Sequence, residues 1–194
     1  MDRIKSAYEI AMERFKERKE VPTEEIEKMD SIPIGKALAA KYLWGKEFDL
    51  LQEINKYPDK IKGYILEGAK ETFLSNIQMP VDKTTLESTK KALEGMFLVK
   101  DNKGALKEIS GQLENLFNYY EKTIEQAFSQ FKEKFSAKMA ASMKSIEKKA
   151  GGKIKIDPEK MPGFREEWMR ALSSLNAQYN SLLAEQKEKL DKIK

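Results

Sequence analysis

The feature that most constrains this fold is an apolar stripe through residues 102–149, interrupted only by Gly104 and Gly111 near its start. The stripe advances in eleven steps across forty residues, about 3.6 residues per step. This is the period of a straight α-helix rather than the 3.5 of a heptad coiled coil, so the segment predicts one helix on the order of 70 Å long. The stripe consists of Leu106, Ile109, Leu113, Leu116, Tyr120, Ile124, Phe128, Phe131, Phe135, Met139, Met143 and Ile146.

A second stripe predicts a last helix over residues 164–192. A connection at about residues 150–163, with glycines and prolines, separates the two helices. Long amphipathic helices joined in this way fold back as an antiparallel hairpin, which places Phe131 and Phe135 opposite the Phe164–Trp168 end. The second stripe consists of Phe164, Trp168, Leu172, Leu175, Tyr179, Leu182, Leu190 and Ile193, with Gln186 as its polar interruption.

The first hundred residues predict shorter helices. Helical spacing indicates helices over residues 2–20, 33–57, 59–77 and 84–98. Pro33 suits the first position of a helix, and Thr84 with Glu87 forms a capping box. We therefore predict an all-α fold, with an N-terminal multi-helix part at residues 1–100 and a long C-terminal antiparallel helical hairpin at residues 102–194.

The amino-acid composition limits the kinds of catalytic and metal site that this chain can form. Charged residues make up 35% of the chain and the net charge is +4, with no cysteine and no histidine. The lack of cysteine excludes disulfides, thiolate metal sites and cysteine nucleophiles. The lack of histidine removes the commonest acid–base catalyst near neutral pH and the commonest transition-metal ligand. We expect no catalytic residues, no metal and no cofactor.

Two motifs that could carry chemistry have simpler interpretations. The run Gly151-Gly152-Lys153 lacks the glycine and the hydroxyl residue of a phosphate-binding loop, because Glu147 and Ile154 occupy those positions. Acidic side chains cluster at residues 24–30, and Glu121 and Glu125 lie one helical turn apart beside the apolar stripe. The sequence favours solvated helix faces for these acids, and a carboxylate enzyme with a divalent metal is the least supported reading.

A basic run marks the expected tip of the hairpin. Residues 132–155 hold eight lysines and two glutamates. Such a run can contact nucleic acid, lipid headgroups or an acidic protein surface, or it can simply solvate the end of a helix and favour its C-terminal dipole. The candidate anion-contacting residues are Lys144, Lys148, Lys149, Lys153 and Lys155.

The hairpin also predicts an interaction surface. A two-helix rod cannot cover both apolar stripes fully, so it must dock on the N-terminal helices, a second copy or another protein. We expect self-association through the part of the hairpin that the N-terminal helices are too short to reach. The candidate interface residues are Phe128, Phe131, Phe135, Met139, Met143, Phe164 and Trp168.

Two segments resemble a known kind of protein. The opening run at residues 6–14, SAYEIAMER, and the run at residues 55–77, with Asn55-Lys56-Tyr57-Pro58 at its start, are similar to a family of small uncharacterised bacterial cytosolic helical proteins. The resemblance implies a bacterial helical protein of unassigned activity. It supplies no catalytic or binding residues to transfer.

Together these patterns favour a non-enzymatic protein-interaction or scaffold protein that binds itself or an unidentified protein. The alternative is a binder of anionic surfaces, through the basic tip; nucleic acid and membrane surfaces are not favoured as partners. The first residues lack the apolar core of a secretory signal, and no stretch approaches 18 uncharged apolar residues. We therefore expect a cytoplasmic protein.

Overall fold

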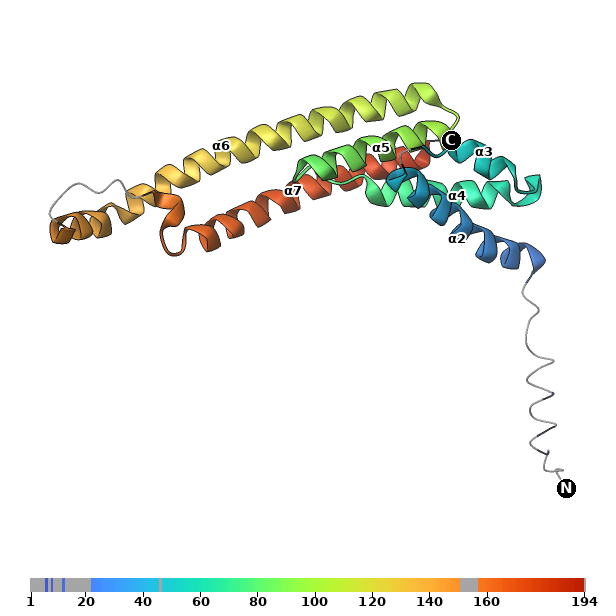
Figure 1. The fold of residues 1–194 in the computed structure, drawn as a ribbon, viewed down its shortest axis with the longest axis horizontal. Coiled ribbons are helices and arrows are strands. Elements are labelled where there is room, and N and C mark those ends of the chain that lie inside the picture. Colours follow the sequence, from blue (N-terminus) through green and yellow to red (C-terminus); the bar gives the residue numbers. More distant parts are fainter. Residues whose placement is uncertain are drawn as a thin grey trace. The chain divides into compact units, whose positions relative to one another are not determined.

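The computed structural model describes residues 22–45, 47–150 and 157–193 and the isolated residues 6, 8 and 12, with the backbone alone for residues 140–150. The helix expected over residues 2–20 lies almost entirely outside this part of the chain. The all-α class is confirmed, since every regular element of the described residues is helical. These elements are α2 (Thr23–Trp44), α3 (Leu50–Asn55), α4 (Asp59–Asn76), α5 (Lys83–Val99), α6 (Lys103–Ala150), the 3-10 helix η1 (Pro158–Lys160) and α7 (Phe164–Lys192) (Figure 1).

The chain forms two compact units, residues 1–72 and residues 73–194. The first unit holds α2, α3 and most of α4. The second holds the last residues of α4 with α5, α6, η1 and α7. The boundary expected from the sequence, near residues 100–102, falls after α5, whereas in the structure α5 contacts α6 inside the second unit.

In the first unit, α2 and α4 approach each other at two glycines. A Cβ atom built on Gly35 would lie 1.9 Å from the carbonyl oxygen of Ile65, and one built on Gly68 would lie 2.1 Å from the carbonyl oxygen of Ile32. No side chain fits at such a distance from a helix backbone. Glycine at both positions therefore permits the close packing of α2 on α4.

The structure corrects the predicted start of the second helix. Pro33 lies inside α2, which begins ten residues earlier, at Thr23. Proline removes one helical hydrogen bond, to the carbonyl of Met29, but both residues are exposed, so water can satisfy that carbonyl. Polar contacts hold the segment before Pro33 against α4: Lys60 with Glu27, Lys28 with Glu67, and Tyr64 with Glu24.

The predicted end of the same helix is also wrong. The helix expected to reach residue 57 ends at Trp44, and α3 begins separately at Leu50. Gly45 follows α2 in an extended conformation, with its N–H donating to the carbonyl of Lys41. Asp49 then caps α3 by accepting from the Gln52 N–H at 2.9 Å. The end of α2 and the N-cap of α3 thus lie within five residues of each other, and they divide into two helices a segment whose apolar pattern predicted one.

The second unit opens with a turn and α5. The helix expected over residues 84–98 is present as Lys83–Val99, but its N-cap is Asp82 rather than Thr84. The Asp82 carboxylate accepts from both the backbone N–H and the hydroxyl of Thr85, at 2.7 and 2.8 Å. Farther along α5, Gly95 leaves room for the ring of Phe73, whose side chain is fully buried.

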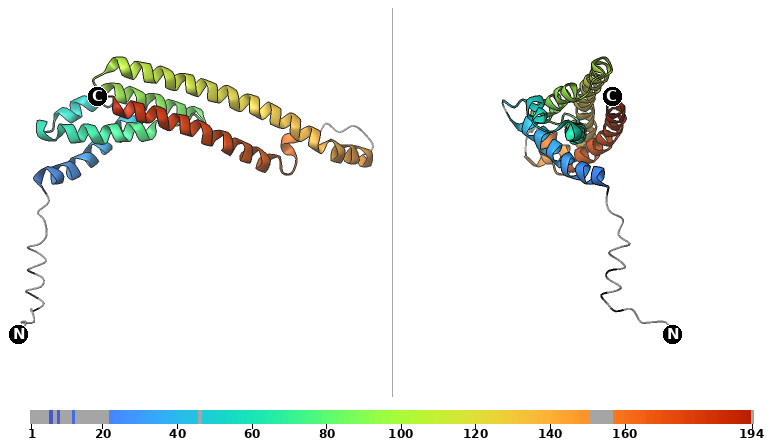
Figure 2. Two further views of the ribbon diagram at one scale, coloured as in Figure 1. Left: turned by 180° about the vertical axis from the view of Figure 1, so that it is seen from behind. Right: turned by 90° about the vertical axis from the view of Figure 1, so that its right-hand side faces the viewer.

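The long antiparallel hairpin is confirmed. The helix α6 is continuous over 48 residues, and α7 packs back along it (Figures 1 and 2). Polar contacts mark the pairing: the Tyr120 hydroxyl donates to Asn176 Oδ1 at 2.8 Å, and the hydroxyls of Thr123 and Tyr179 lie 2.8 Å apart. Figure 1 shows α5 beside the N-terminal portion of α6, whereas the remainder of α6 runs beside α7.

The end of α7 packs into the core of this unit. Leu183 and Leu190 are buried, whereas Leu182, which the sequence placed on the inward stripe, is exposed. The inward face therefore includes Leu183 in place of Leu182, and Leu190 lies on it as predicted. Lys100 is buried beside the last turn of α7, and its Nζ donates to the carbonyl of Asp191 at 2.8 Å. A cation at this position complements the negative end of the helix dipole.

Candidate functional site

The part of the hairpin beyond α5 is held by an aromatic cluster. We call it the distal hairpin: residues 124–139 of α6 with residues 158–175 of η1 and α7. The ring centroids of Phe131 and Phe164 lie 5.1 Å apart, those of Phe135 and Phe164 5.1 Å, and those of Phe128 and Trp168 5.0 Å. Most of these pairs meet edge to face, an arrangement that adds to the stability from burial.

Five of the seven candidate interface residues form this cluster. Phe135 and Phe164 are only 2% and 4% exposed, so these two leave little surface for a partner. Phe128, Phe131 and Trp168 are half-buried and keep accessible surface. Met139 is half-buried as well, and the side chain of Met143 lies outside the described residues.

Two grooves of the distal hairpin share two apolar side chains, Trp168 and Leu172. The inner groove, about 580 Å³, lies where α5 begins and includes Leu86, Ile124, Trp168 and Leu172. The outer groove, about 320 Å³, is formed by α6 and α7 alone. Trp168 and Leu172 line both, because the distal hairpin is only two helices thick. The outer groove is lined by Ala127, Gln130, Phe131, Lys134, Trp168, Ala171, Leu172, Ser174, Leu175 and Gln178.

Ion pairs engage two of the three lysines whose side chains are described in the basic run, and Lys134 is exposed. Lys132 pairs with Glu159 at 2.5 Å, and Lys138 pairs with Glu167 at 2.8 Å. The hydrogen bond to Glu159 raises the pKa of Lys132 above its usual value. The candidate anion-contacting side chains, Lys144, Lys148, Lys149, Lys153 and Lys155, lie outside the described side chains.

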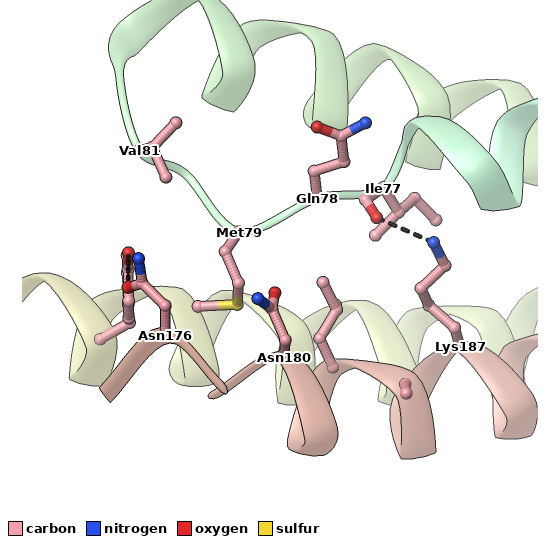
Figure 3. Close-up of a pocket in the computed structure, with 10 residues that line it drawn as sticks. Ile77, Gln78, Met79, Val81, Asn176, Asn180 and Lys187 are labelled. Atoms are coloured by element: carbon pink, nitrogen blue, oxygen red, sulfur yellow. Dashed lines mark hydrogen bonds between the residues drawn. The ribbon is translucent and has the colours of Figure 1, made fainter. Parts of the chain in front are cut away.

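A second site, which we call the loop pocket, lies between α7 and the segment that joins α4 to α5. It has a volume of about 570 Å³. Figure 3 shows Asn176, Asn180 and Lys187 rising from α7 toward this segment, with Met79 above them. Lys187 Nζ donates to the carbonyl of Ile77 at 3.1 Å. The Gln78 side chain, by contrast, points away from α7 (Figure 3).

Burial gives the loop pocket an unusual electrostatic character. Lys187 is the one charged side chain among the described residues that line it. Burial lowers the pKa of the Lys187 amine. Because the unfolded chain holds that proton more tightly, the ammonium costs folding stability at neutral pH, and this cost falls as the pH rises through the folded pKa. Burial also raises the pKa of Tyr120.

Asn176, Asn180 and Lys187 are functional candidates that were not predicted from the sequence. Their spacing of four and seven residues places all three on one face of a helix, and that signal was available. The sequence did not predict that the segment between α4 and α5 covers this face of α7. This segment is positioned by Thr89, whose fully buried hydroxyl accepts from the Gln78 N–H at 3.1 Å and lies 3.1 Å from the Gln78 carbonyl oxygen.

Replacing Thr89 with valine should lower the free energy of unfolding by about 1–3 kcal/mol. Valine keeps the shape but leaves the Gln78 N–H without its acceptor. Chemical denaturation measures the loss, and amide hydrogen exchange at Gln78 should accelerate. Thr89→Ser retains the hydroxyl and is the control: its Gln78 amide should stay protected. Equal exchange rates in the two variants would contradict this role of the hydroxyl.

The acids considered as metal ligands are not gathered into a site. Glu24 and Glu27 are engaged by Tyr64 and Lys60. Within the described ranges, no group of three acidic side chains is arranged to hold a metal ion. In the same ranges, no helix has the length and apolar character to cross a bilayer.

The fold and these sites define an all-α protein built on a long antiparallel helical hairpin. The chain belongs to a family of unknown function, DUF6657, whose model matches residues 51–192. The expectation of an uncharacterised family is confirmed, and the match includes the whole of the similar segment at residues 55–77. Comparisons with curated proteins and with solved structures find no match to this chain.

Proposed function

We propose that this chain is a non-enzymatic, cytoplasmic bacterial interaction protein that pairs with a second copy of itself through the outer groove of the distal hairpin. One observation carries the proposal: Trp168 and Leu172 line two separate grooves of the hairpin. Large apolar side chains accessible in this way favour association, because a partner removes them from water.

The lining of the outer groove suits another helix. Ala127, Ala171 and Ser174 are small, so a partner helix can approach closely and reach the larger apolar groups beneath. Gln130 and Gln178, which also line the groove and are exposed, offer both donors and acceptors. A helix laid into an apolar groove is a recurring recognition mode.

The charge of the distal hairpin favours a second copy over an anionic surface. The hairpin's residues 124–139 and 158–175 carry six basic and five acidic side chains, so the charges nearly balance. A surface that carries both signs of charge can complement itself about a two-fold axis. Across such an axis, basic residues of one copy can face acidic residues of the other copy. The ion pairs of Lys132 and Lys138 with α7 and η1 acids reduce the charge available to nucleic acid or lipid headgroups.

Light scattering coupled to sizing chromatography tests this proposal. We expect a species of twice the 22.4 kDa chain mass. Ala171→Glu places a charge in the outer groove and should weaken the dimer by about tenfold or more, because the charge is buried on association. The matched control is Ala177→Glu, the same exchange at another exposed position of this helix, one that lines neither groove.

A single 22.4 kDa species at all concentrations would contradict self-association. Equal weakening by Ala171→Glu and Ala177→Glu would show that the outer groove is not the interface. Retention on heparin that falls steeply with salt would instead favour the anionic-surface alternative.

A further inference from the structure

We propose that the loop pocket binds a small organic acid, whose carboxylate meets Lys187 and whose apolar part lies on the exposed apolar lining, Val81 and Ala184. The pocket's volume of about 570 Å³ falls within the range of small-molecule sites. This site is separate from the outer groove, so the proposal does not depend on self-association.

The apolar wall of the pocket is preformed. Ile77, Met79 and Leu183 line it and are each buried, at 0%, 6% and 5% exposure. Thr89 holds the covering segment by its hydrogen bonds to Gln78. These buried side chains give the pocket an ordered floor, and the apolar surface that a ligand body of aliphatic or aromatic carbon can contact is that of Val81, which is 67% exposed, and of the exposed Ala184.

The polar wall supplies hydrogen-bond donors. The Tyr120 hydroxyl donates to Asn176 Oδ1, which assigns the acceptor side of that amide and leaves its NH₂ group to donate. Asn180 lies one turn farther along α7 and faces the same segment (Figure 3). The Lys187 ammonium uses one of its three N–H groups to donate to the carbonyl of Ile77, and its other two N–H groups can donate to a ligand.

The charge balance selects an anion. Lys187 has no carboxylate within ion-pair distance among the described side chains, so a half-buried ammonium is met only by a backbone carbonyl. An isolated charge in such a place is costly, and an anion beside it offsets the cost. A single cation next to an apolar wall suits a monocarboxylate better than a phosphate, which calls for more positive charge.

The competing interpretation is structural. The carbonyl of Ile77 follows the end of α4, and a lysine there stabilises the negative end of a helix dipole. On that interpretation Lys187 needs no ligand, and the pocket holds water. The two interpretations differ in whether the pocket distinguishes an acid from its neutral amide.

Calorimetric titration with 4-phenylbutyrate and with 4-phenylbutanamide makes this distinction. The two probes share size and apolar body and differ in charge. We expect the full-length protein to bind the acid at least tenfold more tightly than the amide. Lys187→Met, which keeps the apolar stem, should bring the two affinities within threefold of each other. Lys189→Met, at an exposed position of α7, is the matched control and should retain the tenfold preference.

Asn180→Asp provides a second variant that leaves the buried residues intact, since Asn180 is exposed. Its added carboxylate should weaken binding of the acid by at least tenfold and leave the amide unchanged. Equal affinity of wild-type protein for the two probes, or no heat from the acid at millimolar concentration, would overturn the proposal. So would an unchanged preference in Lys187→Met. Ala171→Glu should bind the acid as wild type does, which separates this result from the test of self-association.

Discussion

Replacing Gly35 with alanine is expected to destabilise the first unit by about 3 kcal/mol or more. The added Cβ would lie 1.9 Å from the Ile65 carbonyl oxygen, 2.7 Å from its carbon and 3.0 Å from the Ala69 nitrogen. These are backbone atoms of a helix, so no side-chain rotation relieves the overlap, and α2 must move away from α4. Overpacking usually lowers the free energy of unfolding by about 1–3 kcal/mol. We expect a loss at or above the upper end of this range, because the added methyl group overlaps backbone atoms. The better helix propensity of alanine, about 1 kcal/mol, offsets only part of this.

Gly63→Ala is the matched control for the same exchange in α4. Gly63 is exposed, and a Cβ built there meets nothing within 4 Å. This variant should be more stable than wild type by about 0.4–1 kcal/mol, because alanine loses less backbone entropy on folding. Gly68→Ala should behave like Gly35→Ala, since its Cβ meets the Ile32 carbonyl. Thermal and chemical denaturation decide the matter, and a Gly35→Ala midpoint at or above that of wild type would disprove the close crossing.

Replacing Phe164 with alanine is expected to cost about 3–5 kcal/mol in the second unit. Phe164 is 4% exposed and packs against Phe128, Phe131 and Phe135 at centroid distances of 6.0, 5.1 and 5.1 Å. Removing the ring opens a cavity that three aromatic neighbours on one helix cannot close. The effect should exceed that of Phe131→Ala or Trp168→Ala, because those side chains are only half-buried.

Tryptophan fluorescence during chemical denaturation reports this loss, because Trp168 belongs to the same cluster. Trp44 is 75% exposed and can be replaced by phenylalanine to leave one reporter. Met169→Ala is the control: its side chain is 55% exposed and should cost less than about 0.5 kcal/mol. A denaturation midpoint for Phe164→Ala equal to that of Met169→Ala would show that the cluster does not stabilise the hairpin.

Helix existence followed from the sequence because helical periodicity is local. The stripe from Leu106 onward predicted a single helix, and α6 spans Lys103–Ala150 without a break. The glycine- and proline-containing connection predicted the reversal, and the pairing of Phe131 with Phe164 followed from chain order alone. Each of these inferences needs only neighbours a few residues apart or the symmetry of a folded-back pair.

Helix boundaries were harder to predict from the sequence where contacts between distant residues override local preference. Pro33 normally starts a helix, yet α2 continues on both sides of it, and the earlier segment is held by contacts such as that of Glu27 with Lys60. Those partners lie 33 residues apart in the chain. The cap at Asp82 was missed for a simpler reason: Thr84 offered an equally good local pattern, and only the backbone course selects between them.

What the sequence determined by itself is an all-helical chain that ends in a long antiparallel hairpin. What only the tertiary structure decided is where that hairpin is covered and where it is open. Asn176, Asn180 and Lys187 become a pocket because Thr89 holds the segment after α4 above them. Trp168 and Leu172 become groove residues because α5 begins beside Ile124 and extends no farther along the hairpin. Both outcomes depend on contacts between residues far apart in the chain. Hydrophobic periodicity is a local property, so it does not predict which surfaces such contacts will cover.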